Sequence, residues 1–532
     1  MGSISWLSGC SDTGALGRVP DASPDGPAFS VEPGAPRDAG MRSLVDASDG
    51  GSAERDAVVD ASAGFPSREA SVPAEPDGGS LPASDSGCSS PTCRLPAEDA
   101  SAADAGAFFA HVPGWSVRKR VLTSGGGHAV LEEVLTSFAE AEPGATRIQS
   151  LGSDGAVEHS FTAPSGSYVS DFCRHPSGEF SVVLVAAADR SVSLVRLDAG
   201  LLPLGAGPIH DPEVSHDIDV DGGPSDLFVN GFALDAARVA RVGEDVLVVV
   251  YSSFYSVIAY RMTFSGGWSA PLRTLVEPPR PLTPFLPTSG SFDTFGALVA
   301  WFRVMVDTDE DGNAFIAIWA NPLKVRAHVA AFRDGLAPLH SEPSHASDAD
   351  VLLTRLNRDG TRAWSRVVGT ENEDEPYAVR ASNGRVVVVG RSRRAPGFDN
   401  TFWDAFVSVS TSAGVLSGSR ALAFDASSIF LSADALPGQA WALAGSDGWS
   451  QNPDGLSVLT FGAKLLVELP SVDAAPLRRA LPPGPRHNEL RSVVAAGGRL
   501  WYGGHEDGPI MHTGDEDPSL IHATGVLGSV AE

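Results

Sequence analysis

Two short segments of the sequence place a carboxylate at every second position. They are Asp217-Ile-Asp219-Val-Asp221-Gly222 and Asp307-Thr-Asp309-Glu-Asp311-Gly312. In a tight loop such alternate side chains converge, and three carboxylates suit a hard cation that takes oxygen ligands. The glycine that follows allows a sharp turn. The pattern predicts Ca²⁺ binding at both segments, and no other cofactor is expected.

Both segments resemble the calcium loops of EF-hands and of some propellers. An EF-hand loop carries a bidentate Glu at its twelfth position. Here that position is Phe228 in the first segment and Ile318 in the second, so neither segment supplies the ligand locally. The second segment also fits a plain hairpin turn, in which Asp and Gly are favoured by turn geometry alone.

Histidines gather with acids in three further segments, where imidazole and carboxylate could together bind a transition metal. They are His210 with His216, His340 with His345, and His505 with His512 and His522. None of them has metalloprotease spacing, and loop histidines near acids are usually solvated polar surface. The sequence contains no nucleophile elbow, phosphate-cradling loop or dinucleotide-binding glycine pattern. We therefore predict no catalytic residue, although the distances that would identify a glycosidase pair of carboxylates do not follow from sequence.

The N-terminal Leu7-Ser8-Gly9-Cys10 resembles the lipobox of bacterial lipoproteins, in which the cysteine becomes the lipidated first residue. The resemblance implies lipidation of Cys10 and a place in the cell envelope as an outer-membrane lipoprotein; a secreted protein is the related alternative. Residues 1–6 are too short for a charged region plus an apolar core. A chance match in a merely exported or cytoplasmic protein therefore stays open.

Residues 11–105 consist mainly of Asp, Ala, Pro, Gly and Ser, and their 17 acids against 6 Arg give a net charge of −11. Such a segment buries too little apolar surface to offset its ordering entropy, so we predict a disordered linker after an export remnant at 1–10. Cys88 and Cys93 could close a small disulfide loop near its end, which suits an oxidising compartment. Cys173 fits a small buried side chain better than a nucleophile.

The whole chain has 532 residues and a formal charge of −28. This acidity argues against nucleic acid or an anionic membrane surface as a partner. No apolar run approaches the roughly 18–20 residues of a transmembrane helix. We expect a monomer that touches a membrane only through a lipid anchor.

From residue 106 to 532 short apolar runs alternate with Gly-, Asp- and Pro-rich turns, which is typical of an all-β fold. The segment closest to a helical stripe is Ala129–Glu140. Seven runs recur at spacings of roughly 50–70 residues and are expected to be the central strands of similar small sheets. They are His128–Leu131, Ser181–Ala186, Val246–Tyr251, Ala314–Trp319, Val386–Gly390, Trp441–Gly445 and Leu500–Gly503. A sheet this small cannot bury both faces alone, and radial packing of such sheets makes a β-propeller.

The clearest copies lie between residues 348 and 504, where an Asp opens a strand, a turn and a Trp follow, and an apolar strand ends in Gly. This pattern resembles the bacterial β-propeller repeat family of secreted and lipid-anchored proteins. We expect about seven blades of four-stranded antiparallel sheet over 106–532, with six or eight also open. Turns at Gly335 and Gly360 lie too close for a full blade and indicate an insertion or a long connection. Ser116–Leu122 is the predicted ring-closing strand, and two β-sandwich domains are the alternative fold.

These features favour a non-catalytic, exported and lipid-anchored propeller that binds a protein or carbohydrate partner. Two other functions stay open at this point. One is a propeller enzyme of the glycoside hydrolase or quinone-dependent dehydrogenase type, for which Trp268, Trp364 and Trp441 are the relevant aromatic positions. The other is a calcium-stabilised adhesion module.

Overall fold

The computed structural model divides the chain into two compact units, Met1–Ser86 and Gly87–Glu532, and the residues it describes all belong to the second. The described ranges are 109–123, 126–134, 145–153, 155–186, 191–209, 237–242, 246–252, 257–263, 272–277, 304–320, 322–333, 335–336, 350–394, 402–424, 426–451, 458–460, 462–508 and 523–532. Several predicted site residues lie outside them: Cys10, Cys88, Cys93, Asp217, Asp219 and Asp221.

The described strands form seven antiparallel sheets. In the order of the strands within each sheet, they are β2 (Ser116–Leu122), β3 (His128–Glu133), β4 (Thr146–Leu151) and β5 (Val157–Thr162); β6 (Ser167–Arg174), β7 (Phe180–Ala186), β8 (Val192–Leu197) and β9 (Pro203–Ile209); β10 (Ala237–Val242), β11 (Val246–Ser252), β12 (Val257–Thr263) and β13 (Leu272–Glu277); β14 (Val304–Thr308), β15 (Ala314–Ala320), β16 (Asp350–Leu356) and β17 (Arg362–Val368); β18 (Asp374–Ser382), β19 (Arg385–Arg393), β20 (Trp403–Thr411) and β21 (Leu416–Leu422); β22 (Ser427–Ala435), β23 (Trp441–Gln451), β25 (Ala463–Leu469) and β26 (Leu477–Arg478), with β24 (Val458–Thr460) beside β23; and β27 (His487–Ala496), β28 (Arg499–Gly508), β29 (Thr524–Ala531) and β1 (Phe109–Pro113).

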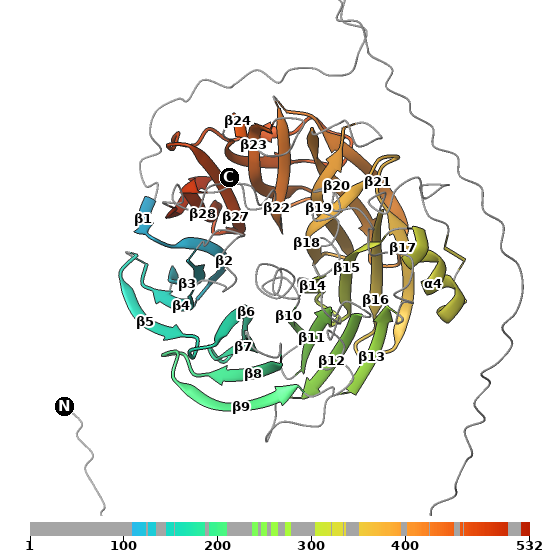
Figure 1. Cartoon of the computed structure of the whole chain (residues 1–532), viewed down its shortest axis with the longest axis horizontal. Helices are drawn as coiled ribbons and strands as arrows, with labels where there is room; N and C mark the ends of the chain where they lie inside the picture. The colour runs from blue at the N-terminus through green and yellow to red at the C-terminus, as the bar shows by residue number, and fades with distance from the viewer. Residues whose placement is uncertain are drawn as a thin grey trace, which may run out of the picture. The chain divides into compact units, whose positions relative to one another are not determined.

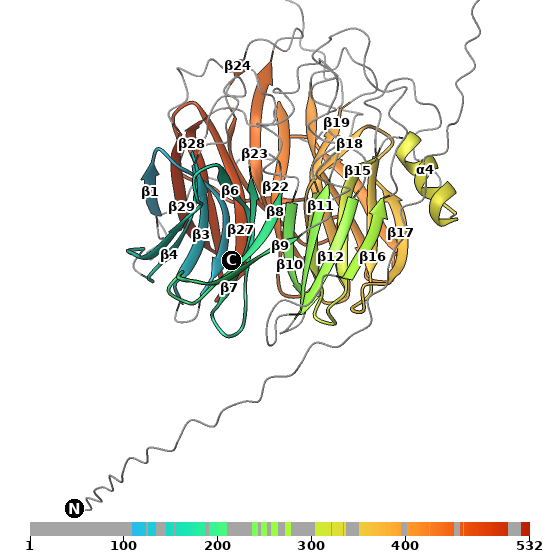
Figure 2. The ribbon, with the colours of Figure 1, turned by 60° about the horizontal axis from the view of Figure 1, so that its bottom comes forward.

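The first strand of each sheet lies closest to a common axis, around which the sheets follow one another in chain order (Figure 1). The innermost strands β6, β10, β14, β18, β22, β27 and β2 contact one another in that sequence, except that β6 meets the β2 sheet through β3 and β4. The view in Figure 2 shows the strands of successive sheets side by side along this axis. The closed ring is a β-propeller, as predicted.

The number of four-stranded blades differs from the prediction. Six sheets are four-stranded blades, whereas the sheet that begins with β22 has a fifth strand, β24. The prediction of seven four-stranded blades is therefore not borne out. Each of the seven apolar runs lies in the second strand of a different sheet, one strand further from the axis than the innermost strand.

One local prediction is corrected, and two others agree with the structure. The ring is closed by β1, which pairs with β29 from Phe109↔Gly528 to Pro113↔Thr524, and not by Ser116–Leu122, which is the innermost strand β2. His128–Leu131 lies in strand β3, as predicted, and the described start of the segment closest to a helical stripe, residues 129–133, belongs to the same strand. The extra length before Gly360 is an insertion between β15 and β16 that contains helix α4 (Pro322–Phe332).

Helix α4 covers part of the β14 sheet. Pro322 suits its first position because that residue needs no hydrogen-bonding N–H there. Val325 is fully buried in the same apolar cluster as Ile316 and Ile318 of β15. The chain leaves the helix at Arg333, whose φ of 58° is left-handed and whose N–H donates to the carbonyl of Val329. None of the helices in the described part of the chain has the length and apolar character needed to cross a membrane.

The hydrophobic core lies between neighbouring sheets. One cluster joins Val407 of β20 to Phe430 and Leu443 of the next sheet, and similar clusters join the β6 and β10 sheets and the β10 and β14 sheets. Side chains on alternate positions of a strand point to opposite faces, so a run such as 386–389 fills two of these interfaces. This explains why the second strands are the most continuously apolar segments.

The two ends of the ring differ in their connections. The turns from first to second strand and from third to fourth strand are short, as at Gly384, where φ is 68°. The connections from the second to the third strand, and from one sheet to the next, leave the opposite end. Several of these are long, such as residues 210–236 between β9 and β10 and 278–303 between β13 and β14. Most of the long connections therefore join strands at the end where the innermost strands begin, and long connections are where binding residues concentrate in loop-bearing scaffolds.

Candidate functional site

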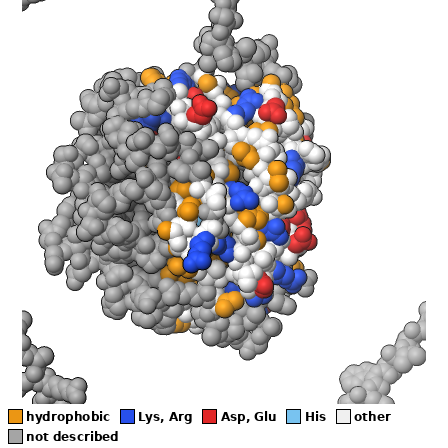
Figure 3. Space-filling model, turned by 90° about the vertical axis from the view of Figure 1, so that its right-hand side faces the viewer, with side chains coloured by type: hydrophobic (Ala, Val, Ile, Leu, Met, Phe, Trp, Pro, Cys, Tyr) orange, Lys and Arg blue, Asp and Glu red, His pale blue; other side chains and the backbone are white. Residues whose placement is uncertain are grey.

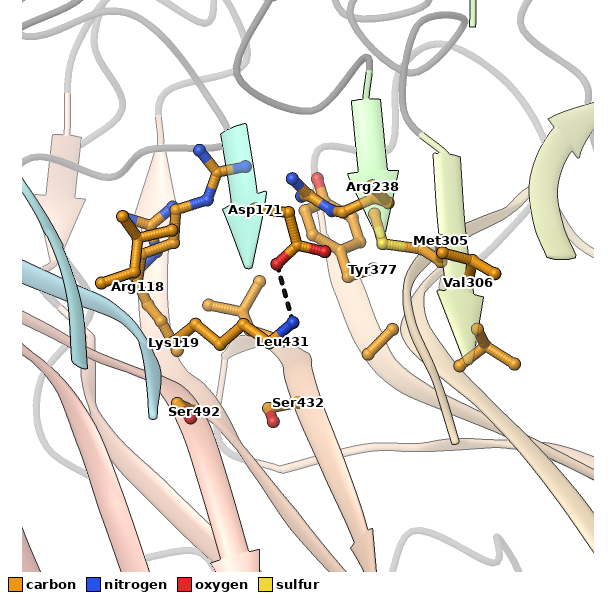
Figure 4. A pocket seen from close by; sticks show the side chains of 14 residues that line it. Arg118, Lys119, Asp171, Arg238, Met305, Val306, Tyr377, Leu431, Ser432 and Ser492 are labelled. Carbon is orange, nitrogen blue, oxygen red and sulfur yellow. Dashed lines mark hydrogen bonds and ion pairs between the residues drawn. The ribbon is translucent and has the colours of Figure 1, made fainter. Parts of the chain in front are cut away.

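A cavity of about 190 Å³ lies on the axis of the ring, because all seven innermost strands contribute to its wall (Figure 4). Its charged lining consists of four cations and one carboxylate among the described residues: Arg118, Lys119, Arg238, Arg491 and Asp171. Its uncharged wall includes Met305, Val306, Tyr377, Leu431, Ser432 and Ser492. The net charge of the whole chain is −28, so a group of four positive side chains around one small space is opposite in sign to the rest of the molecule.

β-Bulges place much of this lining. In five of the innermost strands at least one residue is skipped in the pairing with the second strand. The residues skipped nearest the cavity are Arg118, Ser170, Tyr377, Leu431 and Arg491, and β27 also skips Asn488 near its start. A bulge adds a residue to one strand and changes the direction of its side chain. All of these but Ser170 and Asn488 line the cavity, so the same irregularity, repeated from sheet to sheet, directs side chains toward the axis.

Glycines on the second strands make room for three of these bulges. A β-carbon at Gly390 would lie 1.8 Å from the carbonyl oxygen of Glu375, and Gly445 and Gly504 have the same relationship to Ile429 and Glu489, at 1.8 and 1.9 Å. No side chain larger than hydrogen fits at these positions without moving the innermost strand. The glycine at the end of the apolar run in these three sheets is therefore needed for the innermost strand to form its bulge at the cavity.

Lys119 and Asp171 form an ion pair across the cavity between β2 and β6 (Figure 4). The Lys119 Nζ donates to Asp171 Oδ1 at 2.7 Å and to the carbonyl of Phe172 at 2.8 Å, while Asp171 Oδ2 accepts the Val239 N–H at 3.0 Å. Burial by itself raises the pKa of Asp171, but Lys119, Arg238 and the Val239 N–H outweigh it and leave that pKa lowered. Asp171 is therefore an ionised link among three neighbouring sheets.

Arg118 and Arg491 share a buried carboxylate behind the cavity wall. Arg491 Nη1 forms an ion pair with Glu133, and Arg118 Nη1 lies 3.5 Å from the other oxygen of the same carboxylate. Arg491 also donates to Ser116 Oγ at 3.4 Å. Glu133 is only 1% exposed, so it fixes both guanidinium groups from one side while they line the cavity on the other.

Arg238 and Tyr377 complete the polar wall on the opposite side. Arg238 Nη1 donates to the carbonyl of Ser170 at 3.1 Å, and the guanidinium is half-buried beside Asp171. The Tyr377 hydroxyl donates to Glu375 Oε2 at 3.3 Å, and Glu375 in turn accepts from Arg391 Nε at 2.9 Å. In Figure 4 Arg118, Arg238 and the Tyr377 hydroxyl all lie above the level of the Lys119–Asp171 pair.

The predicted calcium residues Asp307, Asp309 and Asp311 lie at the β14–β15 hairpin. Asp307 Oδ2 accepts from Arg380 Nη1 at 3.0 Å and from the Ala381 N–H at 2.8 Å, which ties this hairpin to the next sheet. Asp309 Oδ1 accepts the Asn313 N–H at 2.8 Å and closes the turn, while Asp311 is exposed. This is the geometry of the plain turn.

Within the described ranges no group of three or more His, Cys, Asp or Glu side chains is arranged to hold a metal ion. Calcium binding by Asp307, Asp309 and Asp311 stays a prediction. Asp171 and Asp434 act as Asp307 does, since Asp434 Oδ2 accepts the Ala495 N–H of the next sheet at 2.8 Å. An Asp on the innermost strand is thus a recurrent link between sheets.

The sequence also singled out several histidines, a cysteine and three tryptophans. Those that lie among the described residues pack against, or hydrogen-bond to, neighbouring side chains. His505 is fully buried, with Nδ1 3.2 Å from Ser116 Oγ. Burial raises the pKa of Cys173 to about 12, so its thiol is not a nucleophile at neutral pH. Trp441 is fully buried, and Trp364 packs on Phe315 with ring centres 6.1 Å apart.

Sequence reasoning missed the residues of the cavity. Arg118, Lys119, Arg238 and Arg491 occur in strands whose alternation gives no sign that their side chains share one space. The available signal was the glycine that ends the apolar run in the last three sheets, because a repeated glycine inside a strand marks a bulge or a close backbone approach. Identifying the bulged residue itself requires the register of the pairing.

No protein-family model and no curated protein sequence matches the chain. Among solved structures, it is similar to the Dos1 propeller, with 9% identity over 78% of each chain and a TM-score of 0.39. It is also similar to the WD40 domain of Neurospora crassa Pan2, with 10% identity over 78% of this chain and 90% of that one, at a TM-score of 0.39. A third is the polysaccharide lyase Uly1, with 8% identity over 78% and 90% and a TM-score of 0.37. Likenesses of this degree concern fold alone and leave both binding and enzymatic roles open.

Proposed function

We propose that this chain is a non-catalytic β-propeller that binds a protein or carbohydrate partner at its axial cavity. The observation that supports the proposal is the lining itself, in which every innermost strand contributes and four cationic side chains gather. A few convergent polar groups in a concave site are the usual form of a binding site. Most of the lining residues lie near the middle of the innermost strands, so the cavity is enclosed by the ring itself.

The side of the molecule seen in Figure 3 offers a contrast. Basic, acidic and hydrophobic side chains are intermixed over its described surface and do not gather by kind. Exposed large hydrophobic residues are scattered over the outer strands, the turns before them and the start of β20: Val157, Leu202, Leu204, Leu272, Phe402, Val415, Leu416 and Leu477. Scattered surface hydrophobics are normal and mark no interface. The cavity is accordingly the better candidate for specific binding.

An enzymatic role is the alternative. Asp171 is the one carboxylate among the described residues that line the cavity, and it is committed to Lys119 at 2.7 Å. Glycoside hydrolysis by the usual route needs two carboxyl groups flanking the bond. The lining described here favours recognition of a charged group over that chemistry.

Export and lipid anchoring belong to the proposal as well. They rest on the lipobox-like Leu7-Ser8-Gly9-Cys10 and on the acidic, Pro- and Gly-rich residues that follow it. The mass of the mature N-terminus tests this part separately, because lipidation would give a diacylglyceryl-modified Cys10.

The test of the binding function is a screen of the full chain against arrays of peptides and oligosaccharides, run beside a panel of glycoside and alcohol substrates. The proposal expects binding that weakens in Arg238→Gln, with no turnover. Turnover that is lost in Asp171→Asn would instead establish the enzyme. Binding that is indifferent to every substitution in the cavity would place the partner elsewhere and contradict the proposal.

A further inference from the structure

One exposed turn has the sequence and geometry for a covalent change of its own, independent of the axial cavity. Strands β18 and β19 are joined by Asn383 and Gly384, whose φ angles of 51° and 68° are those of the tight hairpin turn that an Asn-Gly pair favours. Both residues are exposed. An asparagine that precedes glycine can react with its own main chain, because no β-carbon obstructs the next nitrogen.

The atom that would attack is the main-chain nitrogen of Gly384. Its N–H donates to no described residue, whereas the Gly384 carbonyl accepts the Ser412 N–H at 2.8 Å. The Ser412 side chain is the only described group within 4 Å of the place that a β-carbon would take at Gly384, and it lies 4.0 Å away. The nitrogen is therefore accessible to base, and it can approach the Asn383 side chain without losing a hydrogen bond.

The reaction is an intramolecular acyl transfer, which gains from the closeness of the two groups. The Gly384 nitrogen loses its proton and forms a bond to Asn383 Cγ, the bond from Cγ to Nδ2 breaks, and Nδ2 leaves with a proton as ammonia. The product is a five-membered succinimide ring. Water then opens the ring at either carbonyl, which gives aspartate or an isoaspartate whose main chain runs through the β-carbon. The net change replaces NH₂ by OH, and nothing is oxidised or reduced.

Glu310, from the β14–β15 hairpin of the preceding sheet, holds this turn. Its carboxylate accepts the Asn383 N–H at 3.0 and 3.2 Å and the Ser382 hydroxyl at 3.0 Å. The Ser382 oxygen in turn accepts from Asn383 Nδ2 at 3.1 Å. Burial raises the pKa of Glu310, but the Asn383 N–H and the Ser382 hydroxyl outweigh it and leave that pKa lowered. The group that holds the turn is therefore an ionised carboxylate at neutral pH.

These hydrogen bonds oppose the reaction. Closing the five-membered ring restricts rotation about the Cα–C bond of Asn383, so the turn must open locally while the ring forms. The bonds to Glu310 must then break, and hydrogen bonds to a charged group are among the stronger ones. We propose that Asn383 is a site of spontaneous conversion to isoaspartate and aspartate, and that Glu310 sets the rate by holding the turn closed.

The products change a junction between two sheets. Either product places a new carboxylate beside the ionised Glu310, and like charges repel. Isoaspartate also adds one carbon to the main chain of the turn, which the pairing Ser382↔Arg385 on either side of two residues does not accommodate. The modified turn therefore loses its bonds to Glu310, while Asp307 still accepts the Ala381 N–H.

The experiment is incubation of the folded full chain, with Asn383 followed by peptide mapping and mass spectrometry that separates asparagine, aspartate and isoaspartate. The same chain in guanidinium chloride gives the rate for the unfolded segment. Asn357 is the internal control, because its Nδ2 donates to Thr361 Oγ1 at 3.0 Å within another turn but Arg358 follows it. Glu310→Ala removes the carboxylate. Asp311→Ala is the matched variant, since it removes the same charge from an exposed residue of the same hairpin.

We expect Asn383 to convert more slowly in the folded wild type than in the unfolded chain, and Asn357 to stay intact. Glu310→Ala should speed the conversion of Asn383 about tenfold, the range for loss of a charge-assisted hydrogen bond, while Asp311→Ala keeps the wild-type rate. All of these rates should rise with pH, because the attacking nitrogen must lose its proton.

Faster conversion in a Glu310→Ala protein that melts at the wild-type temperature would establish the role of Glu310. Equal rates in Glu310→Ala and Asp311→Ala would overturn that role, and so would a rise at Asn383 that Asn357 matches, because general opening would then be the cause. An Asn383 that converts no faster than Asn357 in every folded variant would overturn the site itself.

Discussion

Gly390 of β19 lies directly against the carbonyl of Glu375 on β18, so that a β-carbon at position 390 would lie 1.8 Å from that oxygen. The contact exists because β18 bulges at Tyr377, between the pairs Pro376↔Gly390 and Ala378↔Val389. The bulge directs Tyr377 to the cavity. It also brings the backbone of β18 so close to position 390 on the neighbouring strand that only glycine fits there. The backbone of one strand thus determines both a wall residue of the site and a repeated glycine in the sequence.

Gly390→Ala should destabilise the protein by about 2–3 kcal/mol, because the added methyl group must push β18 away and overpacking of this kind is costly. Chemical denaturation followed by tryptophan fluorescence measures the loss. Gly205→Ala is the control, since no atom lies within 4 Å of a β-carbon there. Equal stability of the two variants would show that the bulge does not fix this glycine.

Asp171→Asn should cost about 2–4 kcal/mol at neutral pH, because it leaves Lys119 without its buried counter-charge. The folded-state pKa of Asp171 is lowered, so its contribution is present above the ordinary value of 3.8 and is lost as the pH falls below it. The unfolding free energies of the wild type and Asp171→Asn should therefore converge in acid. A constant difference between pH 7 and pH 3 would contradict the ionised role of Asp171.

Asp374 should show the opposite pH dependence. Burial, with nearby Asp350 adding to it, raises the pKa of Asp374 to about 7 despite hydrogen bonds from Thr370 and Ser392. The folded state holds this proton where the unfolded state has lost it, so stability falls as the pH rises from about 4 to about 7. Asp374→Asn should remove that slope, as measured by denaturation at several pH values. The prediction fails if the variant and the wild type keep parallel pH profiles.

The strand that closes the ring also predicts where the chain can be shortened. A variant that begins at residue 106 keeps β1 and should unfold at the same temperature as the full chain. A variant that begins at residue 115 lacks β1 and leaves the edge of β29 unpaired. Thermal unfolding should therefore occur at a distinctly lower temperature in the second variant alone, and equal melting of both would show that β1 does not hold the ring closed.

The all-β propeller fold was predictable from the apolar runs. Each run, such as 386–389, is continuously apolar because both faces of a second strand are buried against neighbouring sheets. The number of strands in each sheet was less predictable, since β24 has three residues and its pairing depends on tertiary context. The closing strand was misplaced by one because Phe109–Pro113 and Ser116–Leu122 are separated by two residues and differ only in their partners.

The candidate site was not predictable for a related reason. A bulge changes which side chain faces the axis, so strict alternation gives the wrong assignment at Arg118 and Arg491. The carboxylates chosen from their spacing, Asp307 and Asp309, accept hydrogen bonds within a hairpin and at its junction with the next sheet, and calcium binding by them stays a prediction. Local spacing identifies a turn well, but it does not identify which distant strands share a cavity.

The most direct test of the account is the reactivity of individual arginines toward phenylglyoxal, measured by mass spectrometry with and without a peptide or oligosaccharide that binds in the screen. If a partner group occupies the axial cavity, modification of Arg118 and Arg238 should slow on binding while modification of Arg196 stays the same. Binding that leaves the reactivity of Arg118 and Arg238 unchanged would contradict the claim that the cavity is the binding site.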